Sequence, residues 1–206
     1  MTVAEMIKIL DAEFPNAKSD LDYRNPFELL IAVTLSAQTT DVAVNKVTPA
    51  LFQAYPTPEA LAQADVKVVE SYLKTIGLYR NKAKYIVACA RMLVEDFNGE
   101  VPRTRTQLMK LPGVGRKTAN VVLAEGFKLP AIAVDTHVER VAKRLKLAKP
   151  SDSVEDVERK LMRKIPREDW ARAHHLLLLF GRYHSTARNE RDAFELLEEL
   201  KEKHQL

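Results

Sequence analysis

A lysine that follows a glycine-rich turn is the residue of this sequence best placed to act as a nucleophile. Lys117 stands in LPGVGRKTANVVL (residues 111–123), where two glycines mark a turn before a helical segment. The first turn of a helix carries unpaired N–H groups and the positive end of the helix dipole, and Arg116 adds another positive charge. We therefore expect Lys117 to lose its proton easily and to supply a neutral, nucleophilic amine. A lysine that contacts phosphate is the alternative.

The same turn predicts a binding site for an anion. Glycine permits positive φ angles and lets the backbone approach another molecule closely, which is the role we expect of Gly113 and Gly115. The unpaired N–H groups of the following helix bind phosphate without sequence-specific side chains. A simple connection between two helices would use the same residues and remains the alternative.

An aspartate that precedes a helical segment is the second candidate for chemistry. Asp135 lies in AVDTHVERV (residues 133–141), directly before the helix expected over residues 137–145. A capping aspartate accepts hydrogen bonds from backbone N–H groups, which keep it ionised. Such a fixed carboxylate can stabilise a developing positive charge and help to move protons. A purely structural cap is the alternative.

The segments around these residues carry helical patterns, which predicts an all-α protein. Only KLPAIAV (residues 128–134) is ambiguous, and it is short. The last expected helix, residues 192–204, has an apolar face that we expect to pack against its own chain. That face carries Phe194, Leu196, Leu197 and Leu200. Cap and stop residues bound the other helices: Asn25 and Pro26 before 27–38, Thr57 and Pro58 before 59–64, Gly77 after 66–76, Asn98 and Gly99 after 81–97, Thr104 before a short helix, Gly126 after 116–125, and Ser153 before 154–165.

Composition places the chain among soluble globular proteins. Its 206 residues are 46% hydrophobic and 29% charged, which fits one domain or two small ones. No apolar run approaches the roughly 20 residues of a membrane span, and the N-terminus does not resemble a signal peptide. Cys89 is the single cysteine, so an intramolecular disulfide is excluded, and we expect it in the core. We expect no membrane association and a cytoplasmic location, on the nucleoid if the source is bacterial.

Basic residues are unevenly distributed along the chain. The net charge is only +4, but residues 101–118 and 140–149 contain lysines and arginines without any acid, whereas residues 190–203 are rich in glutamate. This pattern favours a polyanion as partner. An ordinary solvated surface is the alternative.

These motifs resemble the endonuclease III family, the helix-hairpin-helix DNA glycosylases with a Gly/Pro…Asp loop. Residues 29–41, 75–86 and 174–188 resemble other blocks of that family, so the likeness runs almost end to end. It implies a two-lobed all-α fold with the DNA-binding cleft between the lobes. Residues 19–129 would form a six-helix lobe with the hairpin, and residues 1–18 and 130–206 the other lobe. The expected partner is double-stranded DNA with damaged bases or abasic sites, bound by a monomer.

The resemblance also implies roles for individual residues. Lys117 matches the family's Schiff-base lysine and Asp135 its catalytic aspartate. Gln38 matches the residue that fills the gap left by the flipped nucleotide, and Leu78 the wedge against the opposite strand. Without the resemblance, we would interpret Gln38 as a surface residue and Leu78 as a core leucine. Further positions implied to contact DNA are Leu111, Gly113, Val114, Gly115, Arg116 and His137.

The activity implied is that of a bifunctional DNA glycosylase and AP lyase of base excision repair. Such an enzyme removes oxidised pyrimidines and cleaves abasic sites by β-elimination. Two alternatives remain open: a non-catalytic helix-hairpin-helix DNA-binding protein, and a glycosylase or AP lyase with a different lesion range. Trapping with borohydride on lesion DNA would separate a lyase from a binding module.

The sequence departs from the family near its C-terminus. Most members carry four cysteines, spaced C-x6-C-x2-C-x5-C, that hold a 4Fe–4S cluster. The corresponding positions here are Ser185, Asp192, Glu195 and Lys201. Because iron–sulfur clusters are held mainly by thiolates, we expect no cluster, and no metal or organic cofactor. A different metal site at His184, Asp192 and Glu195 is disfavoured, since these residues have ordinary roles as solvated or capping groups.

Overall fold

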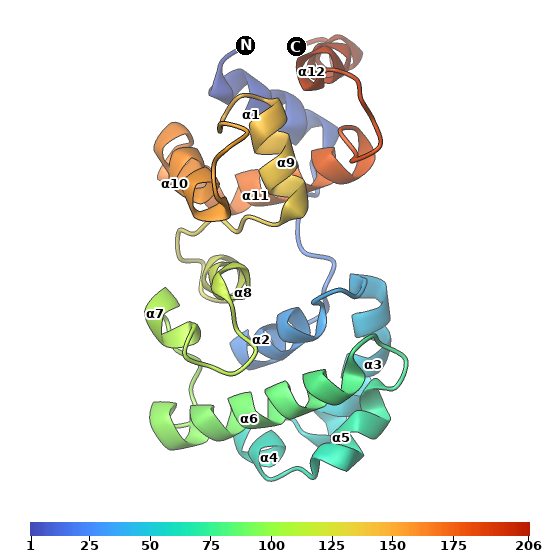
Figure 1. The fold of residues 1–206 in the computed structure, drawn as a ribbon, viewed down its shortest axis with the longest axis vertical. Helices are drawn as coiled ribbons and strands as arrows, with labels where there is room; N and C mark the ends of the chain where they lie inside the picture. Colours follow the sequence, from blue (N-terminus) through green and yellow to red (C-terminus); the bar gives the residue numbers. More distant parts are fainter. The chain divides into compact units, whose positions relative to one another are not determined.

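The computed structural model describes residues 1–206 and is built from helices and connecting segments (Figure 1). This confirms the predicted all-α class. The ambiguous segment over residues 128–134 forms neither a helix nor a strand. None of the helices combines the length and the apolar character that a membrane-spanning segment requires.

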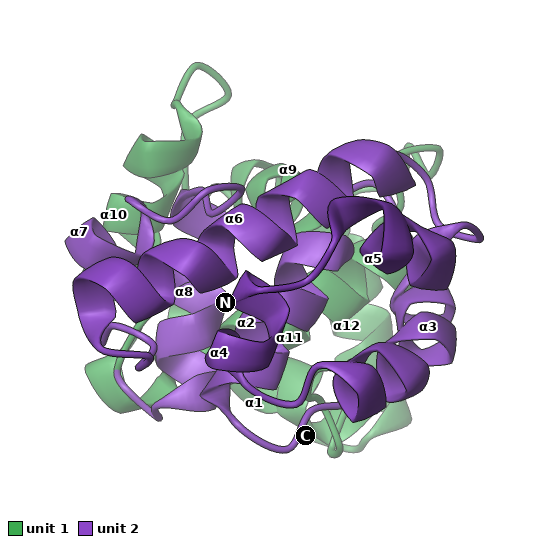
Figure 2. Ribbon diagram, turned by 90° about the horizontal axis from the view of Figure 1, so that it is seen from below, with its two compact units in different colours: residues 1–19, 130–206 green, residues 20–129 purple.

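The chain divides into two compact units, drawn in separate colours in Figure 2. One unit contains residues 20–129, and the other contains residues 1–19 together with 130–206. The helices of the first unit are α2 Pro26–Leu35, α3 Asp41–Ala54, α4 Pro58–Ala62, α5 Val66–Leu73, α6 Tyr79–Phe97, α7 Arg105–Leu108 and α8 Arg116–Val121. The helices of the second unit are α1 Val3–Glu13, α9 Thr136–Arg144, α10 Val154–Lys164, α11 Trp170–Tyr183 and α12 Ala193–Lys203.

Local capping signals determine where many of these helices begin. The side chains of Asn25, Thr57, Thr104 and Ser153 each accept a hydrogen bond from a backbone N–H in the first turn, as predicted. At the other end of α6, Asn98 has φ +55° and Gly99 has φ +76°, and the Gly99 N–H donates to the Leu93 carbonyl. These residues therefore end the helix in the manner predicted for a left-handed cap.

Several predicted helix ends differ from the structure, among them that of α2, which stops at Leu35 and not at Gln38. Helix α5 stops at Leu73, not before Gly77, although Ile76 is still buried. The spacing of Leu73 and Ile76 imitates a helical face, but the Ile76 N–H donates to the Leu73 carbonyl in a turn. Helix α8 changes at Val122 into a π-helical turn, Val122–Gly126, which packs against α2. The helical segment therefore ends at Gly126, as predicted, but its last turn is π-helical.

The C-terminal helix closes the core of its own unit. Leu196, Leu197 and Leu200 of α12 are buried with residues of α1, α9, α10 and α11, and Phe194 packs against the same core half-buried. This confirms the predicted apolar face. Fully burying one such side chain stabilises a fold by roughly 1.5–3 kcal/mol.

A carboxylate at the end of α1 also joins α12 to the unit. Glu13 accepts hydrogen bonds from Lys203 and from His204, both at 2.7 Å, and its other oxygen lies 3.1 Å from the His184 ring. Burial alone would raise the pKa of Glu13, but the hydrogen bonds from Lys203 and His204 and the nearby charges lower it to about 2. The ionised carboxylate is therefore the form that stabilises this unit.

We expect replacement of this carboxylate to weaken the fold in a pH-dependent way. The pKa of Glu13 is lowered in the folded state, so its contribution is complete above the ordinary value of 4.5 and is lost as the pH falls toward 2. Glu13→Gln should lower the stability at pH 7 by roughly 1–3 kcal/mol, the scale of a charged hydrogen bond. Each kcal/mol lowers the Tm by about 2–4 °C in a chain of this length. Melting curves between pH 7 and pH 2.5 should converge, and a constant difference would contradict this assignment.

Candidate active site and nucleic-acid interface

The glycine-rich turn forms a hairpin between α7 and α8, with its backbone exposed and its apolar side chains turned inward. Leu111 is 2% exposed and Val114 is 6% exposed, and the Val114 N–H donates to the Leu111 carbonyl at 3.1 Å. Gly113 and Gly115 lie on the exposed side. Leu111 and Val114 were predicted to contact DNA. Since their side chains belong to the core, only their backbone atoms are available for that role.

The two glycines of the hairpin are required for different reasons. Gly113 has φ +77°, and a Cβ added there would lie 3.0 Å from Cβ of Tyr85 and 3.2 Å from Cγ2 of Thr34. Gly115 has φ −93°, which any residue adopts, and a Cβ added there would meet nothing within 4 Å. The fold therefore requires glycine at position 113, while the open space at Gly115 is available to a ligand.

We expect alanine substitutions to separate these two roles. Gly113→Ala should cost roughly 1–2 kcal/mol from the left-handed backbone alone, and more from the contact with Tyr85. It should lower both the Tm and the affinity for DNA. Gly115→Ala has no steric contact and an ordinary φ, so it should lower the Tm only slightly, through the weaker N-cap. A loss of DNA affinity beyond that effect then reports close approach of the DNA backbone. Thermal melting and equilibrium binding to one DNA duplex test both variants. Equal loss of stability in the two would contradict this account.

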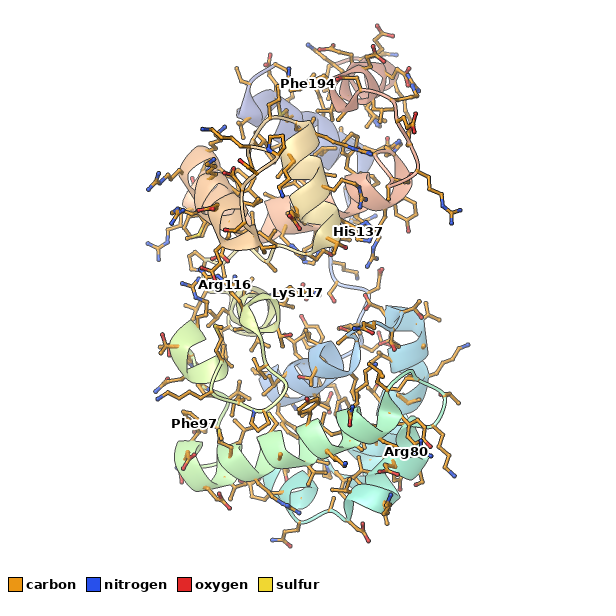
Figure 3. The ribbon with its side chains drawn as sticks, in the orientation of Figure 1. Arg80, Phe97, Arg116, Lys117, His137 and Phe194 are labelled. Atoms are coloured by element: carbon orange, nitrogen blue, oxygen red, sulfur yellow. The ribbon has the colours of Figure 1, made fainter.

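Lys117, the predicted nucleophile, lies in the first turn of α8. Helix α8 begins at Arg116 after the N-cap residue Gly115, so Lys117 is the second residue of the helix (Figure 3). Its side chain is exposed, and the N–H groups of this first turn have no acceptor inside the helix. An exposed amine at the positive end of a helix, beside Arg116, is thus available for nucleophilic attack.

Asp135 is the N-cap of α9. Its Oδ1 accepts a hydrogen bond of 2.8 Å from the Val138 N–H, which confirms the predicted cap. The preceding residues are buried, and the His174 ring donates to the Ala133 carbonyl at 2.8 Å. The carboxylate therefore stands, half-buried, at the end of a segment with little freedom to move. Lys117 and Asp135 belong to different units of the chain.

His137 lies in the first turn of α9 and is half-buried (Figure 3). Its Nδ1 lies 3.1 Å from the Arg140 guanidinium, which also donates to the Gly181 carbonyl at 2.8 Å. A Cβ at Gly181 would lie 3.1 Å from Cβ of His137, so α9 and α11 pack closely at this point. His137 is therefore positioned by the same helix pair that carries Asp135.

Most of the second basic segment is engaged within its own unit. Arg144 donates to the Ser185 hydroxyl and to the Thr186 carbonyl, and Lys143 pairs with Glu139 at 2.6 Å. Arg140 contacts the His137 ring and donates to the Gly181 carbonyl. Most of the basic side chains of residues 140–149 therefore make contacts within their own unit. Fewer of them are available to bind a polyanion than the sequence predicted.

Gln38 and Leu78 lie on exposed loops of the unit formed by residues 20–129. Gln38 has φ +55° and Leu78 has φ +59°, both in the left-handed region that non-glycine residues rarely adopt. Leu78 is 56% exposed, so the interpretation as a core leucine is wrong.

The sequence analysis missed Lys82, which lies between the Gln38 and Leu78 loops. Only 4% of this lysine is exposed, and its Nζ donates to Thr39 Oγ1 at 2.8 Å. One feature of the sequence indicates this burial, because Lys82 lies on the same face of its helix as the buried residues Ile86, Cys89 and Leu93.

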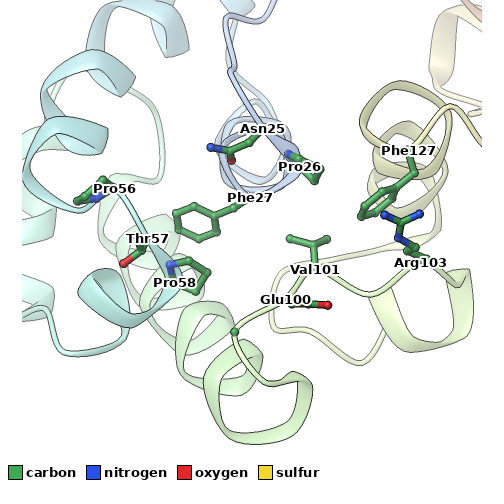
Figure 4. A pocket seen from close by; sticks show the side chains of 11 residues that line it. Asn25, Pro26, Phe27, Pro56, Thr57, Pro58, Glu100, Val101, Arg103 and Phe127 are labelled. Atoms are coloured by element: carbon green, nitrogen blue, oxygen red, sulfur yellow. The ribbon is translucent and has the colours of Figure 1, made fainter.

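A hollow of about 390 Å³ lies elsewhere in this unit (Figure 4). Asn25, Phe27, Thr57 and Val101 contribute to its lining, together with Arg103, whose guanidinium lies 4.8 Å from the centroid of the Phe127 ring. None of the predicted catalytic or DNA-contacting residues lines this hollow.

The residues at the family's cluster positions do not fit an iron–sulfur cluster. Ser185 is buried and accepts a hydrogen bond from Arg144, and Asp192 caps α12 through the Phe194 N–H at 2.7 Å. The single thiol, Cys89, is buried in α6, where burial raises its pKa to about 12. His184 and Asp192 thus have structural roles, and no set of thiolates is available to bind iron.

Comparison with known proteins identifies the class of this protein. Residues 31–167 match the model of the HhH-GPD superfamily base excision DNA repair proteins. The chain is 56% identical to endonuclease III of Bacillus subtilis (strain 168) over 87% of its length and 82% of that protein. It is 48% identical to endonuclease III of Escherichia coli (strain K12) over 95% of its length and 92% of that protein.

A solved structure, titled a trapped endonuclease III–DNA covalent intermediate, superposes with a TM-score of 0.88 at 50% identity and covers 98% of this chain and 96% of that one. The chain belongs to the endonuclease III family. It is a DNA glycosylase/AP lyase of base excision repair and binds DNA.

Proposed function

We propose that the protein excises oxidised pyrimidines from double-stranded DNA and cleaves abasic sites, with Lys117 as the nucleophile. The observation that carries this proposal is the exposed lysine at the second position of α8, next to the glycine hairpin. The relative with 50% identity, trapped as a covalent intermediate with DNA, supports it. Lysine is a residue that forms imines with sugar aldehydes and so divides one difficult step into two easier ones.

In the proposed reaction, the lone pair of the Lys117 amine attacks C1′ of the damaged nucleotide. The bond from C1′ to the base breaks, its electron pair leaves with the base, and the base takes up a proton. The nitrogen then loses a proton, and its lone pair forms the imine as the bond from C1′ to the ring oxygen breaks; that oxygen takes up a proton and becomes a hydroxyl. Removal of a proton from C2′ then expels the 3′ phosphate and cuts the strand, and water releases the sugar from the lysine.

Asp135 has the complementary role in this proposal. A carboxylate held by the Val138 N–H can stabilise positive charge that develops at C1′ as the base departs, and it can pass protons between the amine and the sugar. In this proposal, residues 20–129 supply Lys117, and the other unit supplies Asp135.

Recognition of DNA requires that the target nucleotide leave the duplex, since its C1′ cannot be attacked in the stack. We assign Gln38 to the gap left behind and Leu78 to the opposite strand, as the resemblance implies. The hairpin amides around Gly113 and Gly115 bind backbone phosphates, with a contribution from Arg116. The protein acts as a monomer in this proposal.

A trapping experiment tests the proposed function. The protein is mixed with borohydride and a duplex that contains either an oxidised pyrimidine or an abasic site. We expect a covalent adduct with both. Strand cleavage without an adduct would point to another mechanism, an adduct with the abasic site alone would restrict the activity to the lyase step, and binding alone would overturn the proposal in favour of a DNA-binding module.

We also propose that this activity does not depend on an iron–sulfur cluster. Protein purified from iron-replete cells should be colourless, with less than stoichiometric iron in metal analysis, because the chain offers no set of thiolates. Chelators should leave the trapping reaction unchanged. A brown protein that loses its colour and its activity on oxidation would contradict this prediction.

A further inference from the structure

Two exposed residues with strained backbone conformations lie on neighbouring loops. Gln38 follows α2 and Leu78 precedes α6, and both have positive φ angles without being glycine. Such conformations persist only where the surrounding structure imposes them. A Cβ at Gly77 would lie 3.8 Å from Thr39 Oγ1 and 3.9 Å from the Gln38 carbonyl oxygen, so the two loops are in contact.

Lys82 bonds to both loops at once. Its backbone N–H donates to the Leu78 carbonyl at 3.0 Å as the first main-chain bond of α6, which any residue other than proline would make at this position. Its ammonium donates to Thr39 Oγ1 at 2.8 Å, and this bond is specific to the lysine side chain. The neighbouring Thr40 caps α3, so the loop is tied on its other side as well. Only 4% of the Lys82 residue is exposed, so its side chain is largely covered by the surrounding structure.

Burial of an ammonium group costs free energy unless the group makes a compensating interaction. Burial lowers the pKa of Lys82, and an uncharged side chain of similar length would fill the same space without this cost. The position also lies on the apolar face of α6, in line with Ile86 and Cys89, where a leucine or methionine is expected. The ammonium group therefore has a role other than filling space in the core.

We propose that Lys82 is a positioning residue that holds the Gln38 loop and the Leu78 loop together as one rigid pair, set to enter the duplex when the target nucleotide leaves it. This inference rests on the proposed roles of Gln38 and Leu78. The Lys82 side chain acts through the Thr39 hydroxyl, while its main chain belongs to the helix that follows the Leu78 loop, and it does not touch the reacting atoms. A pair fixed before DNA arrives avoids the entropic cost of ordering two loops during binding.

The test compares two DNA substrates that differ in whether Gln38 and Leu78 must enter a paired duplex. One is a duplex with an abasic site opposite a normal nucleotide. In the other, the abasic site lies in a single-nucleotide bulge, with no partner to separate. The variants are Lys82→Met, which removes the ammonium, and Thr39→Val, which removes the hydroxyl and lies in a loop. Thr39→Ser keeps the hydroxyl and serves as the matched control. Single-turnover trapping rates and Tm are measured for each.

We expect Lys82→Met and Thr39→Val to slow trapping on the paired substrate by roughly tenfold, equivalent to about 1.4 kcal/mol of barrier, with little change on the bulge. Thr39→Ser should behave as the unsubstituted protein, and the double variant should be no slower than either single one. Equal slowing on both substrates, or an unchanged paired rate in Thr39→Val, would overturn the inference even if Lys82→Met does not fold. An unsubstituted protein that traps neither substrate would instead refute the proposed function.

Discussion

Lys117→Gln should abolish borohydride trapping while leaving binding to lesion DNA largely intact. The substitution removes the one atom that forms the imine, whereas the hairpin backbone, the Gly113 turn and the exposed amides of α8 remain. Glutamine is also a good helix former, so the helix should persist. Trapping is measured on a gel under denaturing conditions, and binding by fluorescence anisotropy on the same duplex.

A second lysine of the same unit provides the control. Lys110 is exposed on the segment that leads into the hairpin, and Lys110→Gln removes the same charge without removing the proposed nucleophile. It should weaken binding slightly and trap at full yield. If Lys117→Gln traps at the rate of the unsubstituted protein, the nucleophile is a different amine.

Asp135→Asn should slow base excision by a factor of roughly 10²–10⁴, the range typical of a lost acid–base group. Its stability should change little, because asparagine caps a helix about as well as aspartate and can still accept the 2.8 Å bond from the Val138 N–H. Single-turnover excision of an oxidised pyrimidine and thermal melting measure the two effects separately.

The cap of α10 gives a matched comparison within the same unit. Ser153 accepts a hydrogen bond from the Asp156 N–H, and Ser153→Ala should cost roughly 0.5–2 kcal/mol of stability while leaving excision unchanged. An Asp135→Asn variant that is unstable but fully active would show that Asp135 is only a structural cap.

The features that could be predicted from the sequence depend on neighbouring residues. Asn25, Thr104 and Ser153 bond to N–H groups within three residues, so the sequence around each contains all the information needed. The apolar face of residues 192–204 repeats with the period of a helix and is buried accordingly. The hairpin and the cap at Asp135 could also be predicted, because each depends on residues that are close together in the sequence.

The features that could not be predicted depend on residues far apart in the chain. The bond between Lys82 and Thr39 joins positions 43 residues apart, and no local pattern indicates it. The left-handed conformations of Gln38 and Leu78 contradict their intrinsic preferences and follow from tertiary contacts. The bond between Arg144 and Ser185 is a further example, because it joins positions 41 residues apart and forms only when α9 and α11 pack together.

The discontinuous unit has a consequence for how the chain folds as it is synthesised. Met6, Ile9 and Leu10 of α1 are buried against residues that follow position 130, so α1 leaves the ribosome before α9, α11 and α12 and has no core to join until they arrive. Residues 20–129 form a continuous unit and can fold meanwhile. Once folded, this unit shortens the loop that separates α1 from its partners, which reduces the entropic cost of closing it. During translation, the apolar face of α1 therefore stays without its native partners until the later helices have been made.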